Sequence, residues 1–215
     1  MAGLHEMDLV AVDLSVEPAR RTANDMSQGC PRIEPRGLEG AKRVAPSHAG
    51  RYDGAIPVIG QGVPMQALRV HDFAEGLRLD TLPDATPGPG EVCVQVRACG
   101  VSFFDMLISR GGYQWRPPLP FVVGSEFAGV VDALGDGVEG SFAIGDRVCG
   151  STSIGAWTQR LCVPVNAIHL VAPQASIEEA AVLCMPYGTS LYALRERGCL
   201  QPGETVLVLG ATGSV

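Results

Sequence analysis

A glycine-rich turn closes the chain and is the first feature whose residues point to chemistry. In Gly210-Ala211-Thr212-Gly213, the first glycine permits a tight turn and the next lets a pyrophosphate approach the backbone. The preceding segment, Thr205 to Leu209, is apolar at its last four positions, which is typical of a strand buried on both faces of a parallel sheet. We therefore expect a dinucleotide-binding unit to begin here, with Gly210, Ala211 and Gly213 against the cofactor.

The printed sequence ends before the remaining parts of such a unit. A third glycine, the helix whose positive end holds the pyrophosphate, and the residue that reads the ribose about 20 residues later do not follow. Residues 186–215 are accordingly interpreted as a connecting helix and the first strand of an incomplete Rossmann domain. We expect the chain by itself to be an inactive fragment.

The cysteines show no spacing of the kind used for structural zinc. There are seven, and no two are separated by the two residues of a CxxC motif. Their positions are Cys30, Cys93, Cys99, Cys149, Cys162, Cys184 and Cys199. We expect reduced thiols that act as small core residues, and neither a disulfide framework nor a metal site.

Charge and hydropathy exclude several classes of protein. A net charge of −7 disfavours a phosphate-backbone footprint, so no nucleic-acid partner is expected. No apolar run reaches the roughly 18 residues that span a bilayer, and the N-terminus lacks the order of a secretory signal. The expected location is cytoplasmic, without membrane association.

Closely spaced strands with turns between them occupy the middle of the chain. Glu91 to Arg97 alternates apolar and polar residues, as in a half-buried strand, and Ser102 can cap a helix that runs to Ser109. A capping box at Ser176 opens a helix to about Cys184, and a second helix is predicted over Gly188–Arg197. Further strands are predicted at Gln66–Val70, Leu77–Thr81, Phe127–Leu134, Asp146–Val148, Ala156–Val163 and Ile168–Val171. This pattern favours a β-barrel or sandwich over βαβ repeats.

The first 64 residues differ from the remainder in showing no sustained period of 2 or 3.6. We expect a mostly disordered extension at 1–64. A regulatory arm and an over-extended gene model with Met65 as the true start are the alternatives.

From Met65 onward the chain resembles the medium-chain dehydrogenase/reductase superfamily, specifically its zinc-free quinone oxidoreductase branch. The segments that carry the resemblance lie in order along the chain. They are Pro87 to Val92, Ala98 to Ser102, Gly112-Tyr113, Pro117 to Pro120, Gly124 to Val131, Gly145 to Val148, Tyr187 to Thr189, Leu200 to Glu204 and the terminal glycine turn. The resemblance implies a fold that is mainly β with flanking helices. It consists of a GroES-like, partly open β-barrel as the substrate domain, residues 65–185, followed by the start of a Rossmann domain.

The resemblance also implies reduction of quinones or α,β-unsaturated carbonyls by NADPH without zinc. Zinc enzymes of the superfamily place a Cys where Ser102 stands and a His where Ser125 stands, and hydroxyls are poor zinc ligands. Glu126, which neighbours the zinc in those enzymes, is then expected to be a buried, hydrogen-bonded carboxylate. A homodimer is one assembly that the intact enzyme could adopt.

Five residues receive site roles from the resemblance, each beside a structural alternative. Tyr113 matches the active-site tyrosine of zinc-free enoyl reductases, although it could pack on its loop beside Trp115. Ser102 stands where most quinone reductases have Asn, although it also suits a helix N-cap. Thr189 matches a threonine near the nicotinamide, or caps a helix turn. Trp115 and Met185 could line a quinone pocket, with ordinary packing as their default.

Two other functions stay open at this point. The barrel could persist as a non-enzymatic GroES-like binding or interaction module, with Thr205–Leu209 joining a partner strand. Alternatively, the substrate could be an enoyl thioester.

Overall fold

The computed structural model describes residues 10–12, 63–211, 213 and 215, with only the backbone described for 10–12. The chain divides into two compact units, one of residues 46–185 and one that contains residues 186–215 with the segment 10–12. Each unit is treated by itself below. The prediction of disorder for 1–64 falls almost wholly outside the described residues. Where it can be compared, Val10–Val12 form strand β1.

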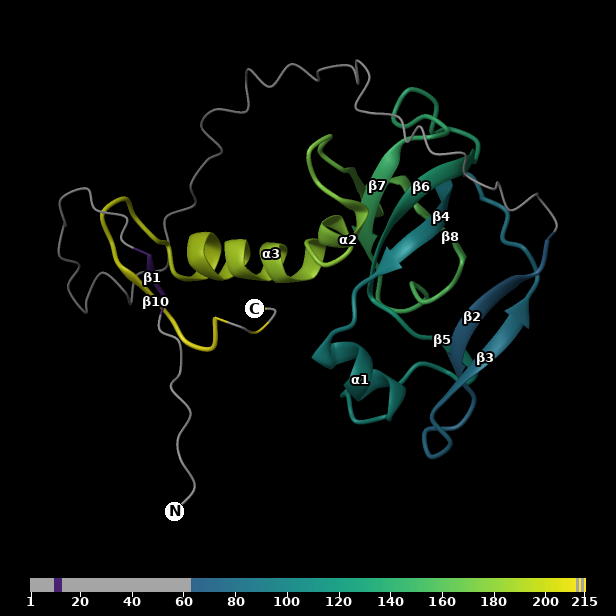
Figure 1. Ribbon diagram of the computed structural model, residues 1–215, viewed down its shortest axis with the longest axis horizontal. Helices are drawn as coiled ribbons and strands as arrows, with labels where there is room; N and C mark the ends of the chain where they lie inside the picture. The colour runs from purple at the N-terminus through teal and green to yellow at the C-terminus, as the bar shows by residue number, and fades with distance from the viewer. Residues whose placement is uncertain (1–9, 13–62, 212, 214) are drawn as a thin grey trace. The chain divides into compact units, whose positions relative to one another are not determined.

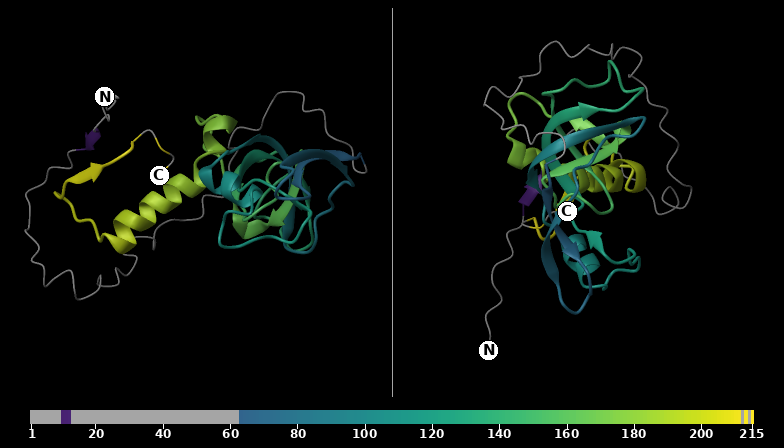
Figure 2. Two further views of the ribbon diagram at one scale, coloured as in Figure 1. Left: turned by 90° about the horizontal axis from the view of Figure 1, so that it is seen from below. Right: turned by 90° about the vertical axis from the view of Figure 1, so that its right-hand side faces the viewer.

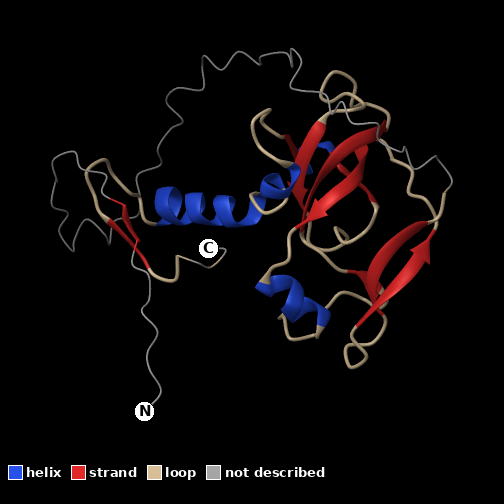
Figure 3. Ribbon diagram, in the orientation of Figure 1, coloured by secondary structure: helices blue, strands red, loops and turns tan. Residues whose placement is uncertain are grey.

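Two antiparallel sheets make up the larger unit (Figure 1). The five-stranded sheet has the order β8-β4-β6-β7-β9, and the three-stranded sheet has the order β3-β2-β5. The five-stranded sheet contains β4 (Glu91–Cys99), β6 (Glu126–Leu134), β7 (Arg147–Ser151), β8 (Arg160–Pro164) and β9 (Ile168–Leu170). The three-stranded sheet contains β2 (Met65–Val70), β3 (Leu77–Leu82) and β5 (Phe121–Val122). Strand content dominates this unit, as Figure 3 shows, and the predicted mainly-β class is confirmed.

A short connecting segment, residues 157–159, joins the two sheets without closing them. The N–H of Leu68 donates to the carbonyl of Trp157 at 2.9 Å, and the N–H of Gln159 donates to Gln66 at 3.0 Å. On its other side, Gln159 accepts from the N–H of Val96 at 3.0 Å. The two sheets therefore meet along this segment, and the expected partly open barrel is confirmed. Figure 2 shows the fold from two further sides.

Both faces of the five-stranded sheet are covered, because successive residues of β6 and β7 contribute to different core clusters. Phe127 and Val148 belong to the cluster inside the barrel, with Val92 and Val94. Ala128 and Cys149 belong to a second cluster that also contains Ile177, on helix α2 (Ile177–Ala180). The half-buried alternation predicted for Glu91–Arg97 is wrong, since residues 92–95 are all buried. Covering structure on both faces removes the solvent side that such alternation requires.

The helices match the predicted boundaries only in part. Helix α1 (Phe103–Ser109) is capped by Ser102, as predicted. Helix α2 ends at Ala180, four residues before the predicted end, and α3 (Cys184–Leu191) begins before Gly188. Pro186 explains this, because a proline is accommodated in a first helical turn, where its missing N–H has no intrahelical acceptor. The helix continues as η2 (Tyr192–Arg197) with π geometry, and η1 (Val165–Ala167) is a short 3₁₀ turn.

Strand β10 (Val206–Val208) pairs antiparallel with β1. The prediction of a strand buried on both faces of a parallel sheet is wrong for the described residues, because Leu207 and Leu209 are 64% and 66% exposed. Burial of both faces requires parallel neighbours and covering helices, and within the described part of the unit β10 has only β1 as a neighbour.

Disulfide bonds correct the expectation of reduced thiols for Cys93 and Cys162, and also for Cys199, which is disulfide-bonded. Cys93 and Cys162 lie directly opposite each other on β4 and β8, with Cα atoms 4.0 Å apart, and form a disulfide. Their separation of 69 residues hides this pairing in the sequence, since only the strand register brings them together. Cys99, Cys149 and Cys184 are free thiols.

Candidate functional site

The first turn of α1 organises both residues expected to contact the substrate. Ser102 closes a capping box with Asp105: its Oγ accepts from the N–H of Asp105 at 3.3 Å and donates to Asp105 Oδ2 at 2.7 Å. The N–H of Ser102 donates to the same carboxylate oxygen at 2.8 Å. The expected N-cap role of Ser102 is confirmed, and Asp105 is structural. A direct role of Ser102 toward a substrate stays a prediction.

Tyr113 is held against this same turn by Phe104. The two rings lie edge-to-face, with centroids 4.8 Å apart and 85° between their planes. Tyr113 also packs at the margin of a buried cluster that includes Ile108 and Phe121. The structure thus places the ring in the packed position that was the alternative to a site role, and this fixes where the phenol oxygen can be.

Glu126 is the buried carboxylate of this region. It is 3% exposed, and its Oε1 accepts from the N–H of Met185 at 2.6 Å. Burial raises the pKa of Glu126; the backbone bond from Met185 opposes this rise, and the nearby Asp105 carboxylate adds to it. Gly100 makes the packing feasible, because a Cβ there would lie 3.1 Å from Glu126 Cβ and 3.0 Å from the carbonyl of Ala181. The expected buried, hydrogen-bonded carboxylate is therefore present.

Two buried oxygens near this turn lack a hydrogen-bond partner among the described residues: Asp105 Oδ1 and Ser125 Oγ. Each would gain from a donor or acceptor brought by a ligand or water. The donor set does not fit zinc, since Ser102 and Ser125 replace a thiolate and an imidazole, and Ser102 Oγ is already engaged by Asp105. Within the described ranges, no three His, Cys, Asp or Glu side chains gather as a metal site.

The residues expected to bind a cofactor lie in the smaller unit. Gly210 follows β10 with φ +71°, and a Cβ there would contact nothing within 4 Å, so its backbone is open to close approach. The N–H of Gly213 donates to the carbonyl of Gly210 at 2.8 Å, which forms the expected tight turn. Ala211 and, on α3, Thr189 are exposed. The turn at Gly210 to Gly213 has the open backbone that a pyrophosphate would need. The cofactor roles of Gly210, Ala211, Gly213 and Thr189 stay predictions.

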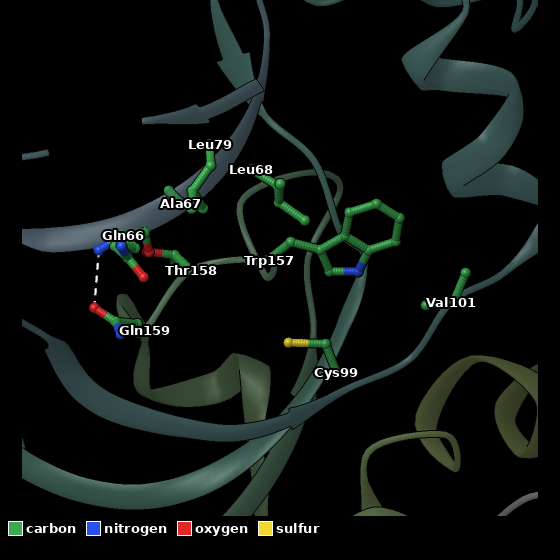
Figure 4. A pocket seen from close by; sticks show the side chains of 9 residues that line it. All are labelled: Gln66, Ala67, Leu68, Leu79, Cys99, Val101, Trp157, Thr158 and Gln159. Atoms are coloured by element: carbon green, nitrogen blue, oxygen red, sulfur yellow. Dashed lines mark hydrogen bonds between the residues drawn. The ribbon is translucent and has the colours of Figure 1, made fainter. Parts of the chain in front are cut away.

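A cavity of about 400 Å³ opens elsewhere in the larger unit, along the seam between the two sheets (Figure 4). It is lined by Gln66, Ala67, Leu68, Leu79, Cys99, Val101, Trp157, Thr158 and Gln159. Neither Ser102 nor Tyr113 belongs to this lining. Trp115 and Met185, for which a pocket was the alternative to ordinary packing, do not belong to it either.

The lining of this cavity has no formal charge. Burial and the Asp105 carboxylate raise the pKa of the Cys99 thiol to about 11, and that thiol donates to the carbonyl of Ala156 at 3.1 Å. The indole N–H of Trp157 is used by the carbonyl of Gly100 at 2.9 Å, which leaves the apolar part of the ring for the cavity. No sequence motif pointed to Cys99 or Trp157, because the seam that brings them together depends on tertiary pairing.

Comparison with known proteins places the chain in a family. The alcohol dehydrogenase GroES-like domain matches residues 88–173. Quinone oxidoreductase-like protein 2 of Mus musculus is 39% identical over 155 residues, which cover 72% of this chain and 44% of that protein. The solved structure of human synaptic vesicle membrane protein VAT-1 homolog-like protein is 33% identical, with a TM-score of 0.62 over 65% of this chain and 45% of that one.

Escherichia coli quinone oxidoreductase, solved in complex with NADPH, is 28% identical, with a TM-score of 0.56 over 62% of this chain and 41% of that one. The fold and these similarities define a GroES-like domain of the alcohol dehydrogenase type. The chain belongs to the medium-chain dehydrogenase/reductase superfamily, in its quinone oxidoreductase branch. It spans less than half the length of these relatives. Among the described helices, none has the length and apolarity to cross a bilayer.

Proposed function

We propose that this chain is the substrate-binding part of a zinc-independent, NADPH-dependent reductase of quinones or α,β-unsaturated carbonyls. The observation that carries the proposal is the shared support of two hydroxyl residues by one helical turn. Ser102 caps α1 through Asp105, and Phe104, two residues further on, holds the ring of Tyr113. The similarity to quinone oxidoreductase-like protein 2 supports a quinone as acceptor.

The cofactor would supply a hydride when bound, and Thr189, Gly210, Ala211 and Gly213 are the residues proposed to hold it. Negative charge then develops on the carbonyl oxygen of the acceptor. A phenol that is already oriented can donate a hydrogen bond to that oxygen without reorganising, and so stabilises the transition state more than bulk water does. We assign this donor role to Tyr113.

Ser102 has a supporting role in this proposal. Its single O–H donates to Asp105 Oδ2, so its hydroxyl oxygen remains available mainly as an acceptor. The bond fixes the start of α1 and hence the position of Phe104. Ser102 can donate a hydrogen bond to the substrate only by exchanging its bond to Asp105 for one to the substrate.

The test is steady-state oxidation of NADPH by this protein joined to a complete dinucleotide-binding domain, with a benzoquinone, a simple enone and an enoyl thioester as acceptors. We expect turnover of the quinone or the enone that is unchanged after dialysis against a metal chelator. Absence of turnover with all three acceptors would refute the reductase. Loss of activity after chelation would refute zinc independence. A preference for the thioester would show that the substrate is an enoyl thioester and not a quinone or a simple enone.

A further inference from the structure

Two free thiols meet where strand β7 passes the beginning of helix α3. The sulfur atoms of Cys149 and Cys184 are 3.8 Å apart, with the Cys184 thiol placed to donate to Cys149. Cys149 is 5% exposed, and Cys184 is half-buried. Both residues lie in the unit of residues 46–185, so their spacing does not depend on the placement of the smaller unit. The proposed reductase chemistry uses neither thiol.

We propose that Cys149 and Cys184 form a reversible oxidation site, which an oxidant of the hydroperoxide class converts into a disulfide between β7 and α3. The observation behind this is the contact of two thiols from segments 35 residues apart in the sequence. A lone buried cysteine would have no partner to complete such a reaction, whereas this one has a second thiol already in contact.

The two thiols differ in a way that assigns their roles. The hydrogen bond from Cys184 lowers the pKa of Cys149, and this outweighs the opposing effects of burial and of the Glu126 carboxylate. Donation of that bond and burial raise the pKa of Cys184. Cys149 is therefore the thiolate that attacks the oxidant, and Cys184 is the thiol that resolves the product.

The reaction balances in two steps. The Cys149 thiolate attacks one oxygen of hydrogen peroxide, the O–O bond breaks, and the products are a sulfenic acid and, after one proton is taken up, water. Cys184 then loses its proton and attacks the sulfenic sulfur; an S–S bond forms as the S–O bond breaks, and the departing hydroxide leaves as a second water. Overall, two thiols and one peroxide yield one disulfide and two waters.

Formation of the Cys149–Cys184 disulfide requires the two sulfur atoms to move closer together. A disulfide has its sulfurs about 2.05 Å apart, so the present 3.8 Å must shorten by roughly 1.8 Å. Cys149 is paired on both sides, to Ala128 of β6 and His169 of β9, so its strand is the fixed part. The movement falls on the first turn of α3, next to the bond between the Met185 N–H and Glu126. Oxidation should thus tie α3 to the sheet and alter the surroundings of Glu126.

The test is a peptide map of the full 215-residue chain. The protein is reduced, freed of reductant, treated with hydrogen peroxide, alkylated and digested after Arg and Glu. Cleavage at Arg147, Arg160, Glu179 and Arg195 puts Cys149 on peptide 148–160 and Cys184 on peptide 180–195, while Cys162 falls on a separate peptide. We expect these two peptides to appear joined, lighter than their sum by two hydrogens, and to separate again with dithiothreitol.

Variants complete the experiment. Cys149→Ser and Cys184→Ser should each abolish the joined peptide, and Cys184→Ser should leave Cys149 as sulfenic or sulfinic acid. Cys99→Ser is the matched control, since Cys99 is another free thiol of the described residues and its own hydrogen bond goes to the carbonyl of Ala156. This variant should behave as wild type. Circular dichroism verifies that each variant is folded. Recovery of both peptides alkylated and unjoined from folded, peroxide-treated protein would overturn the proposal, as would joining of Cys149 to any other cysteine.

Discussion

The ring of Tyr113 stands edge-on against the ring of Phe104, with centroids 4.8 Å apart and 85° between the planes. Phe104 lies in the first turn of α1, one residue before Asp105 of the capping box. The helix start therefore fixes the proposed donor through one aromatic contact, and an error in that contact would displace the phenol oxygen. Positioning errors of about 1 Å can cost on the order of 100-fold in rate.

Phe104→Leu should lower kcat of the reductase, because the leucine retains apolar volume but loses the edge-to-face contact. Loss of that contact should lower the free energy of unfolding by about 0.5–1.5 kcal/mol. Phe73→Leu is the matched control, since Phe73 packs on the same cluster and against Phe121 without forming the ring contact to Tyr113. If both variants lose the same stability but only Phe104→Leu lowers kcat, Phe104 positions Tyr113. If both variants lower kcat equally, Phe104 has only a packing role.

Arg160 holds a buried ion network on β8. It is 3% exposed, its Nη1 lies 2.7 Å from Asp84 Oδ1, and its Nε lies 2.8 Å from Asp132 Oδ2. Arg160→Met removes the cation and leaves the carboxylates poorly compensated, so we expect a loss of about 3–5 kcal/mol in the free energy of unfolding.

The comparison for Arg160→Met is Arg69→Met, which removes the more exposed pair to Asp80. Such pairs contribute about 0–1 kcal/mol. Urea denaturation of both variants beside wild type measures the difference, and similar losses for the two would contradict the assigned role of the Arg160 network.

Gly124 combines a left-handed backbone with a close neighbour. Its φ is +105°, and a Cβ at this position would overlap the backbone and indole of Trp157. Gly137 has φ +82° but nothing within 4 Å of the same position. Gly137→Ala should therefore lower the free energy of unfolding by about 1 kcal/mol, from backbone strain alone. Gly124→Ala should lower it several times more, which would be measured as a larger drop in melting temperature. Equal drops would show that the Trp157 contact is not limiting.

Glu126 should make stability depend on pH in a defined direction. Because burial raises its pKa above the ordinary 4.5, the folded protein holds the proton more tightly than the unfolded chain. The resulting stabilisation is complete below the ordinary pKa and is lost as pH rises through the raised folded value. Glu126→Gln retains an oxygen for the Met185 N–H but cannot ionise, so its stability should not decline over that window.

Urea denaturation at several pH values from about 4 to about 8 compares Glu126→Gln with wild type across the ordinary carboxyl pKa. Glu75→Gln, at an exposed turn, controls for the loss of a carboxyl group as such. The difference between wild type and Glu126→Gln should move in favour of the variant as pH rises. A difference that stays constant over this range would contradict the assignment.

Local signals in the sequence predicted what depends on neighbours along the chain. Ser102 and Ser176 cap their helices because a capping box needs only residues three apart. Strands β2, β3 and β6 follow the predicted segments within a residue or so. Pairings over long separations were not accessible from the sequence. The Cys93–Cys162 bond and the pairing of β1 with β10 depend on strand register, and the Cys149–Cys184 contact depends on how α3 packs on β7.

The site shows the same division. The serines at positions 102 and 125 are read directly from the sequence, and the buried state of Glu126 was predictable from the position that it matches in the family. The orientation of Tyr113 by Phe104 required coordinates, because a side-chain contact across a loop leaves no period in the sequence.

The central claim is that the Tyr113 hydroxyl polarises the acceptor carbonyl, and Tyr113→Phe tests it most directly because it removes one oxygen and keeps the ring on Phe104. NADPH-dependent quinone turnover should be measured for this variant in the protein joined to a complete dinucleotide-binding domain. Tyr192→Phe, which changes an exposed tyrosine on η2, is the matched control. We predict that kcat falls on the order of 100-fold for Tyr113→Phe, with a KM near that of wild type, and that the control is unchanged. A Tyr113→Phe enzyme with the kcat of wild type would contradict the account.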